Sequence, residues 1–104
     1  MGKKAILING SLRAKGNTDT IIKSLLQGAQ NTDILIKQFV LRELKISGCK
    51  GCYFCYDHNK CSIKDDMQKI HKELQQSDLI IFASPMYWWG VTGLMKTFID
   101  RLYL

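Results

Sequence analysis

The chain has 104 residues, of which 46% are hydrophobic and 23% charged, so it can bury one core but not two. No apolar run is long enough to cross a bilayer, and the N-terminal apolar stretch is too short for a signal peptide, so we expect a cytoplasmic domain without a membrane partner. Fifteen basic and nine acidic residues give a net charge of +6. The basic residues are scattered rather than gathered in a run, so no nucleic-acid partner is expected.

The first part of the chain predicts two strands joined by a helix. Lys3–Asn9 is a short apolar run typical of a strand buried on both faces. Residues 33–41 are rich in Ile, Leu, Phe and Val and predict a second strand. Between them, with Asn17 or Thr18 available as the cap, apolar residues recur at helical spacing: Ile21, Ile22, Leu25, Leu26 and Ala29.

The remainder of the chain predicts a long loop, two helices and a third strand. Residues 44–62 show no period and contain every cysteine. Asp65 and Asp66 are expected to place negative charge in the first turn of a helix with an inner face of Met67, Ile70 and Leu74. Leu79–Ala83 reads as a third buried parallel strand. A last helix reaching the C-terminus is predicted by the spacing of Val91, Leu94, Met95, Phe98, Ile99 and Leu102. Alternating strands and helices indicate an α/β fold with a parallel sheet.

Residues 10–18, between the first strand and the first helix, have the composition of a phosphate-binding loop. Free amides at a helix start attract anions, and hydroxyl, guanidinium and amide groups come from Ser11, Arg13, Asn17 and Thr18. The loop lacks both the triphosphatase and the three-glycine dinucleotide patterns, which favours a monophosphate. The alternative is that these residues serve only as turn and cap.

Residues 84–93 follow the third strand and contain three consecutive aromatic residues, Tyr87, Trp88 and Trp89. Ligands of parallel sheets bind beyond the carboxyl ends of the strands, where both this loop and the phosphate loop should lie. Flat rings suit a flat ligand. The alternative is that the aromatic rings pack in the core or on a partner.

The cysteines form a C-x2-C-x2-C-x5-C pattern made by Cys49, Cys52, Cys55 and Cys61. This spacing is close to that of bacterial ferredoxins, so we rank a 4Fe-4S cluster first. A zinc site made by the four thiolates ranks second, with His58 nearby. Uncommitted thiols are the third reading, and disulfides are disfavoured in a reducing compartment.

Three motifs together resemble the NADPH-dependent FMN reductases of the flavodoxin-like superfamily. They are Gly-Ser-Leu-Arg with Gly-Asn-Thr, Ser-Pro-Met-Tyr-Trp, and Gly-Leu-Met-Lys-Thr-Phe-Ile-Asp-Arg. The cysteine loop makes the chain most similar to the iron-sulfur flavoproteins of that family. The resemblance implies a three-layer sandwich with strand order 2-1-3, FMN as cofactor and NAD(P)H as electron donor. It further implies that Ser11, Arg13, Asn17 and Thr18 hold the FMN phosphate, and that the ribityl chain and isoalloxazine are lined by Pro85, Met86, Tyr87 and Trp88.

The resembled family continues with two further strands and their helices. We therefore expect residues 1–104 to be one C-terminally incomplete domain with its third strand at a sheet edge. In consequence we expect either a homo-oligomer or a truncated chain with weakened FMN affinity. The sequence offers no constellation of nucleophile and base, so no catalytic side chain is expected and the cofactor would carry electron transfer. The alternatives are a cysteine-rich metal-binding module and an inactive fragment.

Overall fold

The computed structural model describes residues 2–102, and its centre is a three-stranded parallel sheet. The strands are β1 (Lys3–Asn9), β2 (Ile34–Val40) and β3 (Leu79–Ala83), in the order β2-β1-β3. Ala5 on β1 aligns with Ile36 on β2 and with Leu79 on β3. The predicted α/β class and the strand order 2-1-3 are confirmed.

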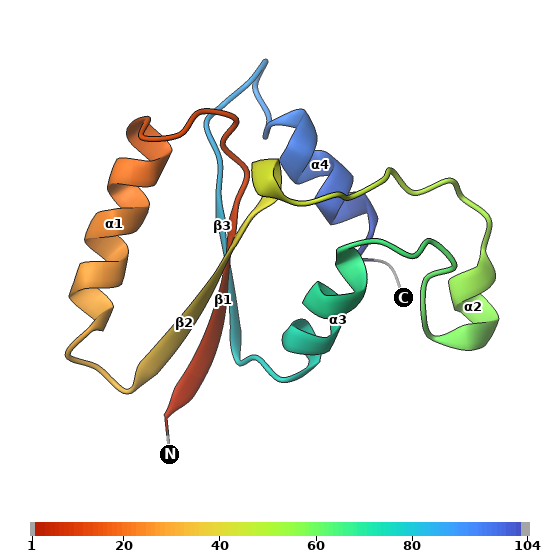
Figure 1. Cartoon of the computed structure of the whole chain (residues 1–104), viewed down its shortest axis with the longest axis horizontal. Helices are drawn as coiled ribbons and strands as arrows, with labels where there is room; N and C mark the ends of the chain where they lie inside the picture. Colours follow the sequence, from red (N-terminus) through yellow and green to blue (C-terminus); the bar gives the residue numbers. More distant parts are fainter. Residues whose placement is uncertain (1, 103–104) are drawn as a thin grey trace.

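The helices cover the two faces of this sheet. Helix α1 (Asn17–Ala29) lies on one face, and α3 (Met67–Gln75) and α4 (Gly93–Asp100) lie on the other (Figure 1). The chain thus folds as the three-layer sandwich of the flavodoxin-like class. No helix within residues 2–102 is both long and apolar enough to span a membrane.

The main core lies between the sheet and helices α3 and α4. Side chains alternate along a strand, so Ile6 and Ile8 of β1 point to this face, whereas Ala5 and Leu7 point towards α1. All four are fully buried, which confirms β1 as a strand covered on both faces. The core cluster is completed by Phe39, Leu41, Met67, Ile70, Met95 and Phe98.

Strand β3 is less buried than its sequence predicts. Leu79, Ile80 and Phe82 are between 38% and 51% exposed. The prediction of a third buried strand is wrong for these side chains, because among the described residues only β1 pairs with β3. The predicted place of this strand at the sheet edge is confirmed.

The predicted start of α1 needs correction. Its N-cap residue is Gly16, which has no side chain to bond the first amides, and Asn17 is already the first helical residue. Neither Asn17 nor Thr18 is therefore the cap. The Thr20 hydroxyl group donates to the Gly16 carbonyl oxygen at 3.0 Å.

The other two long helices also differ at their ends. Helix α3 begins at Met67, so Asp65 and Asp66 precede its first turn. Helix α4 begins at Gly93 and is capped by Thr92, whose Oγ1 accepts from the Met95 amide, so Val91 lies outside it. The helix ends at Asp100, so Leu102 lies outside it, and the predicted extension beyond residue 102 lies outside the described residues.

The predicted long loop contains one short helix. After the 3-10 turn η1 (Leu41–Glu43), the chain runs away from the sandwich to α2 (Phe54–His58) (Figure 1). Tyr53 and Asn59 flank α2 with φ values of 62° and 54°. A five-residue helix between two left-handed residues has no hydrophobic period, so the sequence gives no sign of it.

Candidate functional site

The loops that follow β1 and β3 lie side by side at the carboxyl edge of the sheet (Figure 1). The Gly10 amide donates to the Ala83 carbonyl oxygen at 2.8 Å. The Thr92 hydroxyl group donates to the Gly10 carbonyl oxygen at 2.6 Å. These hydrogen bonds join the phosphate loop (residues 10–18) to the base of the aromatic loop (residues 84–93), on the rim where sheets of this class bind ligands.

Hydrogen bonds within the first loop fix its shape. The Ser11 amide donates to Asn9 Oδ1 at 3.0 Å, and Ser11 Oγ accepts from the Arg13 amide at 3.2 Å. The same hydroxyl group donates to the Arg13 carbonyl oxygen at 3.1 Å. Ser11 is buried, so its side chain is committed to the loop and would have to turn to contact a ligand.

Asp19, in the first turn of α1, gathers the polar groups beneath the loop. Its carboxylate accepts from Asn9 Nδ2 and from the Lys15 amide, each at 2.9 Å, and from Arg42 at 3.1 Å. These bonds, with the Asn9 bond largest, hold the pKa of Asp19 below its usual value. Arg42 neutralises Asp19 through this ion pair. It also donates to the Ser11 carbonyl oxygen at 3.2 Å, which links the end of β2 to the loop.

Sequence reasoning missed Asp19 and Arg42. Arg42 follows β2 almost directly, and the carboxyl ends of parallel strands share one rim. The position of Arg42 directly after a strand could therefore have placed it near the phosphate loop.

The remaining predicted phosphate ligands lie around an open helix start. Arg13 and Asn17 are exposed, and Thr18 is half-buried. Because Gly16 supplies no side-chain cap, the first amides of α1 are left to water or to an anion. A helix N-terminus with a guanidinium group beside it can bind one phosphate group.

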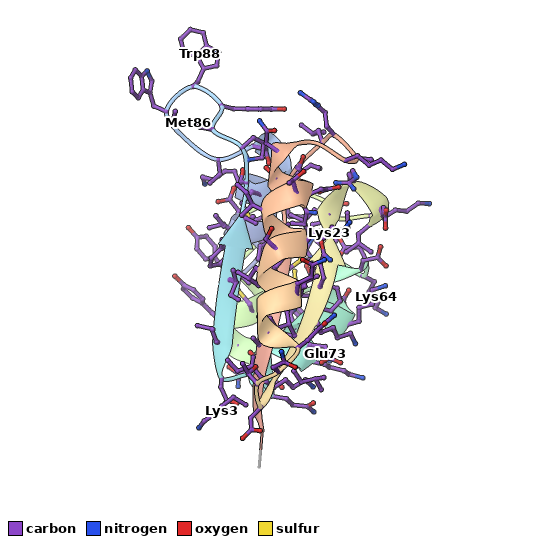
Figure 2. The ribbon with its side chains drawn as sticks, turned by 90° about the vertical axis from the view of Figure 1, so that its left-hand side faces the viewer. Lys3, Lys23, Lys64, Glu73, Met86 and Trp88 are labelled. Carbon is purple, nitrogen blue, oxygen red and sulfur yellow. The ribbon has the colours of Figure 1, made fainter. Side chains whose placement is uncertain are left out.

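The aromatic loop forms a tight hairpin above the rim. Tyr87 and Gly90 exchange two backbone hydrogen bonds of 2.9 and 3.0 Å, and Trp88 and Trp89 form the tip between them. Figure 2 shows Trp88 at this tip, pointing away from the sheet and from α1. The structure therefore brings the predicted loop to the rim, but directs Trp88 into solvent.

The base of this hairpin is fixed more firmly than its tip. Ser84 Oγ donates to the Pro85 carbonyl oxygen at 2.8 Å and accepts from the Thr92 amide at 3.1 Å. Pro85 is half-buried, whereas Met86 and Tyr87 are exposed. A cavity of about 270 Å³ is lined by Met86, Trp88 and Trp89 alone, so it is separate from the phosphate loop.

All four cysteines have free thiols and line one small cavity of about 30 Å³. Cys49 and Cys52 are exposed, and Cys55 and Cys61 are half-buried. A hydrogen bond with the Ser62 hydroxyl group, at 3.3 Å, is the main cause that lowers the pKa of Cys52. Within residues 2–102, no three His, Cys, Asp or Glu side chains lie close enough together to hold a metal. The donor set suits a cluster, and the exposed half of the loop would have to close around it.

Arg101, just after α4, connects this loop to the body of the protein. Its Nη1 donates to the Ser47 carbonyl oxygen at 2.7 Å and to Asp65 at 2.8 Å, and its Nη2 donates to Asp65 at 3.1 Å. Burial opposes charge on both partners, but their mutual attraction outweighs it, lowering the pKa of Asp65 and raising that of Arg101. Asp65 Oδ1 does accept from the Met67 amide at the start of α3, at 3.1 Å, but the helix-dipole prediction missed that the same carboxylate forms a nearly buried ion pair with Arg101.

Asp66 also has a role that the helix-dipole prediction missed. It accepts from the Lys45 amide at 2.7 Å, and the Asp66 amide donates back to the Lys45 carbonyl oxygen at 3.1 Å. This exchange fixes the chain that leads to the cysteines against the start of α3.

A cavity of about 870 Å³ lies next to the cysteine loop, not at the rim. Its lining includes Phe54, Lys60, Cys61 and His71. None of the eight predicted flavin ligands lines it. His71, which also lines this cavity, forms a hydrogen bond between its Nε2 and the Arg101 carbonyl oxygen at 2.9 Å.

Fold and rim together define a flavodoxin-like protein. Residues 3–104 match the NADPH-dependent FMN reductase family, and the chain belongs to that family. Within it, the chain is similar to iron-sulfur flavoproteins, as the cysteine loop indicated.

Three relatives illustrate this similarity. An iron-sulfur flavoprotein of Archaeoglobus fulgidus is 36% identical over 99 residues, which cover 95% of this chain and 45% of the relative. One from Clostridioides difficile is 39% identical over 101 residues, covering 94% and 45%. A Bacillus subtilis protein, which is named as an NAD(P)H-dependent FMN-containing oxidoreductase, is 30% identical over 99 residues. The match covers 94% of this chain and 51% of that protein. The chain thus spans about half the length of the curated relatives it matches.

Proposed function

We propose that this chain forms the FMN-binding part of an oxidoreductase that takes electrons from NAD(P)H. The observation that carries the proposal is the pair of hydrogen bonds that join Gly10 to Ala83 and Thr92 at the carboxyl edge of the sheet. They bring an open helix start and an aromatic loop to one rim. A phosphate and a flat ring system need those two features together.

The FMN phosphate would lie at the start of α1. Arg13 and Asn17 are exposed and can turn towards it, and the uncapped amides of α1 face the same space. Thr18 would add a hydroxyl group, and Ser11 would contribute by exchanging its bonds to Arg13 for a bond to phosphate. Asp19 does not repel the anion strongly, because Arg42 neutralises it.

The ribityl chain and the isoalloxazine would lie against the aromatic loop. Pro85, Met86 and Tyr87 follow the fixed base of the hairpin, and Trp88 would have to fold down from the tip to cover the ring. The chemistry that bound FMN supplies is acceptance of a hydride from a nicotinamide and release of the electrons to an acceptor. The protein's part is to bind, orient and shield that ring.

The cysteines would extend the electron path. One cavity is lined by Cys49, Cys52, Cys55 and Cys61. Their spacing is closer to that of 4Fe-4S proteins than to the two separated cysteine pairs of most zinc sites. We therefore propose that they hold such a cluster and that it receives electrons from the flavin site.

The phosphate assignment is tested by substitution of its two exposed ligands. Arg13→Ala and Asn17→Ala each remove one hydrogen bond to a charged group, which is worth about 1.5 to 3 kcal/mol. We expect each variant to bind FMN about ten- to a hundredfold more weakly in a fluorescence-quenching titration.

Lys23→Ala is the matched control for this titration. Lys23 is an exposed basic residue of α1 that lies one turn beyond the loop, and its removal should leave the dissociation constant unchanged. Wild-type affinity in both loop variants would refute the phosphate assignment.

The cofactors themselves are tested by the absorption spectrum and metal content of anaerobically purified protein. Flavin bands with a broad brown shoulder are expected if both cofactors are bound. A colourless protein with one equivalent of zinc would contradict the oxidoreductase proposal and identify a metal-binding module instead.

A further inference from the structure

We propose that Arg101 is a positioning residue for the cysteine-bound cluster, and that its ion pair with Asp65 sets the reduction potential of that cluster. The inference rests on the proposed cluster but concerns residues outside the cysteine motif. One buried cation at the end of α4 would thus act on a redox centre held by a loop that is distant in sequence.

The first support is the position of Arg101 at the cysteines. Arg101 lines the same cavity of about 30 Å³ as Cys49, Cys52, Cys55 and Cys61. Its side chain has no exposed surface, and the partnered Asp65 side chain is only 9% exposed. Charges in such a place are weakly screened by solvent and act strongly on a neighbouring redox group.

The second support is that Arg101 holds both approaches to the loop. Nη1 bonds the Ser47 carbonyl oxygen before the first cysteine, and Nη2 contacts the Ile63 carbonyl oxygen after the last cysteine at 3.5 Å. One guanidinium group thus closes the base of the cysteine loop. Such a clamp limits how far the four thiols can separate.

The third support is a donor left without a partner. Arg101 is 2% exposed, and its Nε has no hydrogen-bond partner among the described residues. A buried N–H group without an acceptor is costly. Hydrogen bonds to cluster sulfurs raise the reduction potential, and a thiolate or sulfide in the adjoining cavity would provide the missing acceptor.

The charge argument fixes the direction of each effect. Reduction adds one electron to the cluster, so the total charge becomes more negative by one and no bond is made or broken. Arg101 stabilises that added charge, and Asp65 opposes it. Removing the cation should lower the reduction potential, and removing the anion should raise it.

The experiment measures potentials and iron content of the full chain after anaerobic reconstitution with iron and sulfide. Reductive titration with dithionite should give a lower potential for Arg101→Gln, a higher one for Asp65→Asn and one near wild type for the double variant. Arg101→Lys keeps the charge but not the two-armed clamp, so it should lose iron faster under chelation while the retained clusters keep a near-native potential.

Lys69→Gln is the matched control. Lys69 forms an exposed ion pair with Asp66, next to Asp65 in the chain, and solvent should screen its charge. Its variant should keep the wild-type potential. If Arg101→Gln fails to fold, Asp65→Asn should still raise the potential, and the double variant, which leaves no unpaired charge, should bring it back to near the wild-type value.

The outcomes separate this inference from the proposed function. An iron-loaded Asp65→Asn variant with an unchanged potential, or single variants that shift in the same direction, would overturn the role of Arg101 alone. A wild-type protein that takes up no iron would reject the cluster and this inference with it, whereas FMN binding would be judged by its own titration.

Discussion

Gly10 is required by the close approach of β1 to α4. A Cβ atom at this residue would lie 2.9 Å from Met95 Cβ and 3.2 Å from Thr92 Oγ1. We expect Gly10→Ala to lower the free energy of unfolding by about 1 to 3 kcal/mol, as overpacking of a rigid core does. Urea denaturation monitored by circular dichroism measures the change.

Gly28, near the end of α1, provides the matched control. A Cβ atom there would meet nothing within 4 Å, and alanine is the better helix former. Gly28→Ala should therefore raise the free energy of unfolding by about 0.5 to 1 kcal/mol. Effects of the same sign at both glycines would contradict this explanation.

At this scale, the sequence revealed residues whose partners are near in the chain and hid those whose partners are far. Ser11 and Arg13 could be assigned to one loop because they are almost adjacent. Arg42 reaches Asp19 across 23 positions, and Arg101 reaches Asp65 across 36. Such pairs depend on the order of the strands and helices, which no local pattern encodes.

The hairpin tip combines strain with exposure. Trp88 and Trp89 have φ values of 48° and 64° and are 95% and 90% exposed, so they occupy left-handed backbone without packing in return. Replacing the pair by Asn-Gly, which suits a two-residue turn with positive φ at both positions, should raise the free energy of unfolding by about 1 to 2 kcal/mol. Thermal or urea denaturation is the measurement.

Replacement of both tryptophans by alanine is the control for this turn. It removes the same rings but keeps a Cβ atom at each left-handed position, so it should leave stability nearly unchanged. An equal gain in both double variants would show that the rings, rather than the backbone, are unfavourable.

The regular elements could be predicted because each carries its own period. The bounds of β1 and β3 were predicted correctly, and β2 differs by one residue at each end. Helix ends were less predictable: α1 begins after a glycine, and the two aspartates before α3 also bind Arg101 and the backbone of residues 45 and 47. Caps depend on which partner competes for a side chain, and tertiary contacts decide that.

At the scale of the whole molecule, the outer edge of β3 is the prominent unpaired surface. Leu79, Ile80 and Phe82 expose apolar side chains from both faces of a strand without charges, whereas the opposite edge strand β2 carries Lys37. We propose that two copies of this chain pair along β3. Size-exclusion chromatography with light scattering should show a dimer or larger species, and Leu79→Lys should shift it to the monomer.

Leu35→Lys on β2 is the control for self-association. Leu35 is 70% exposed, so the change adds the same charge to the other edge of the sheet and should leave the oligomer intact. A wild-type chain that runs as a monomer at all concentrations would refute pairing along β3.

Helix α4 touches both segments that matter to the proposed chemistry. Thr92 at its start holds Gly10, and Arg101 after its end holds Ser47, with eight helical residues of about 12 Å between them. The rim and the cysteine loop are therefore anchored to opposite ends of the same helix.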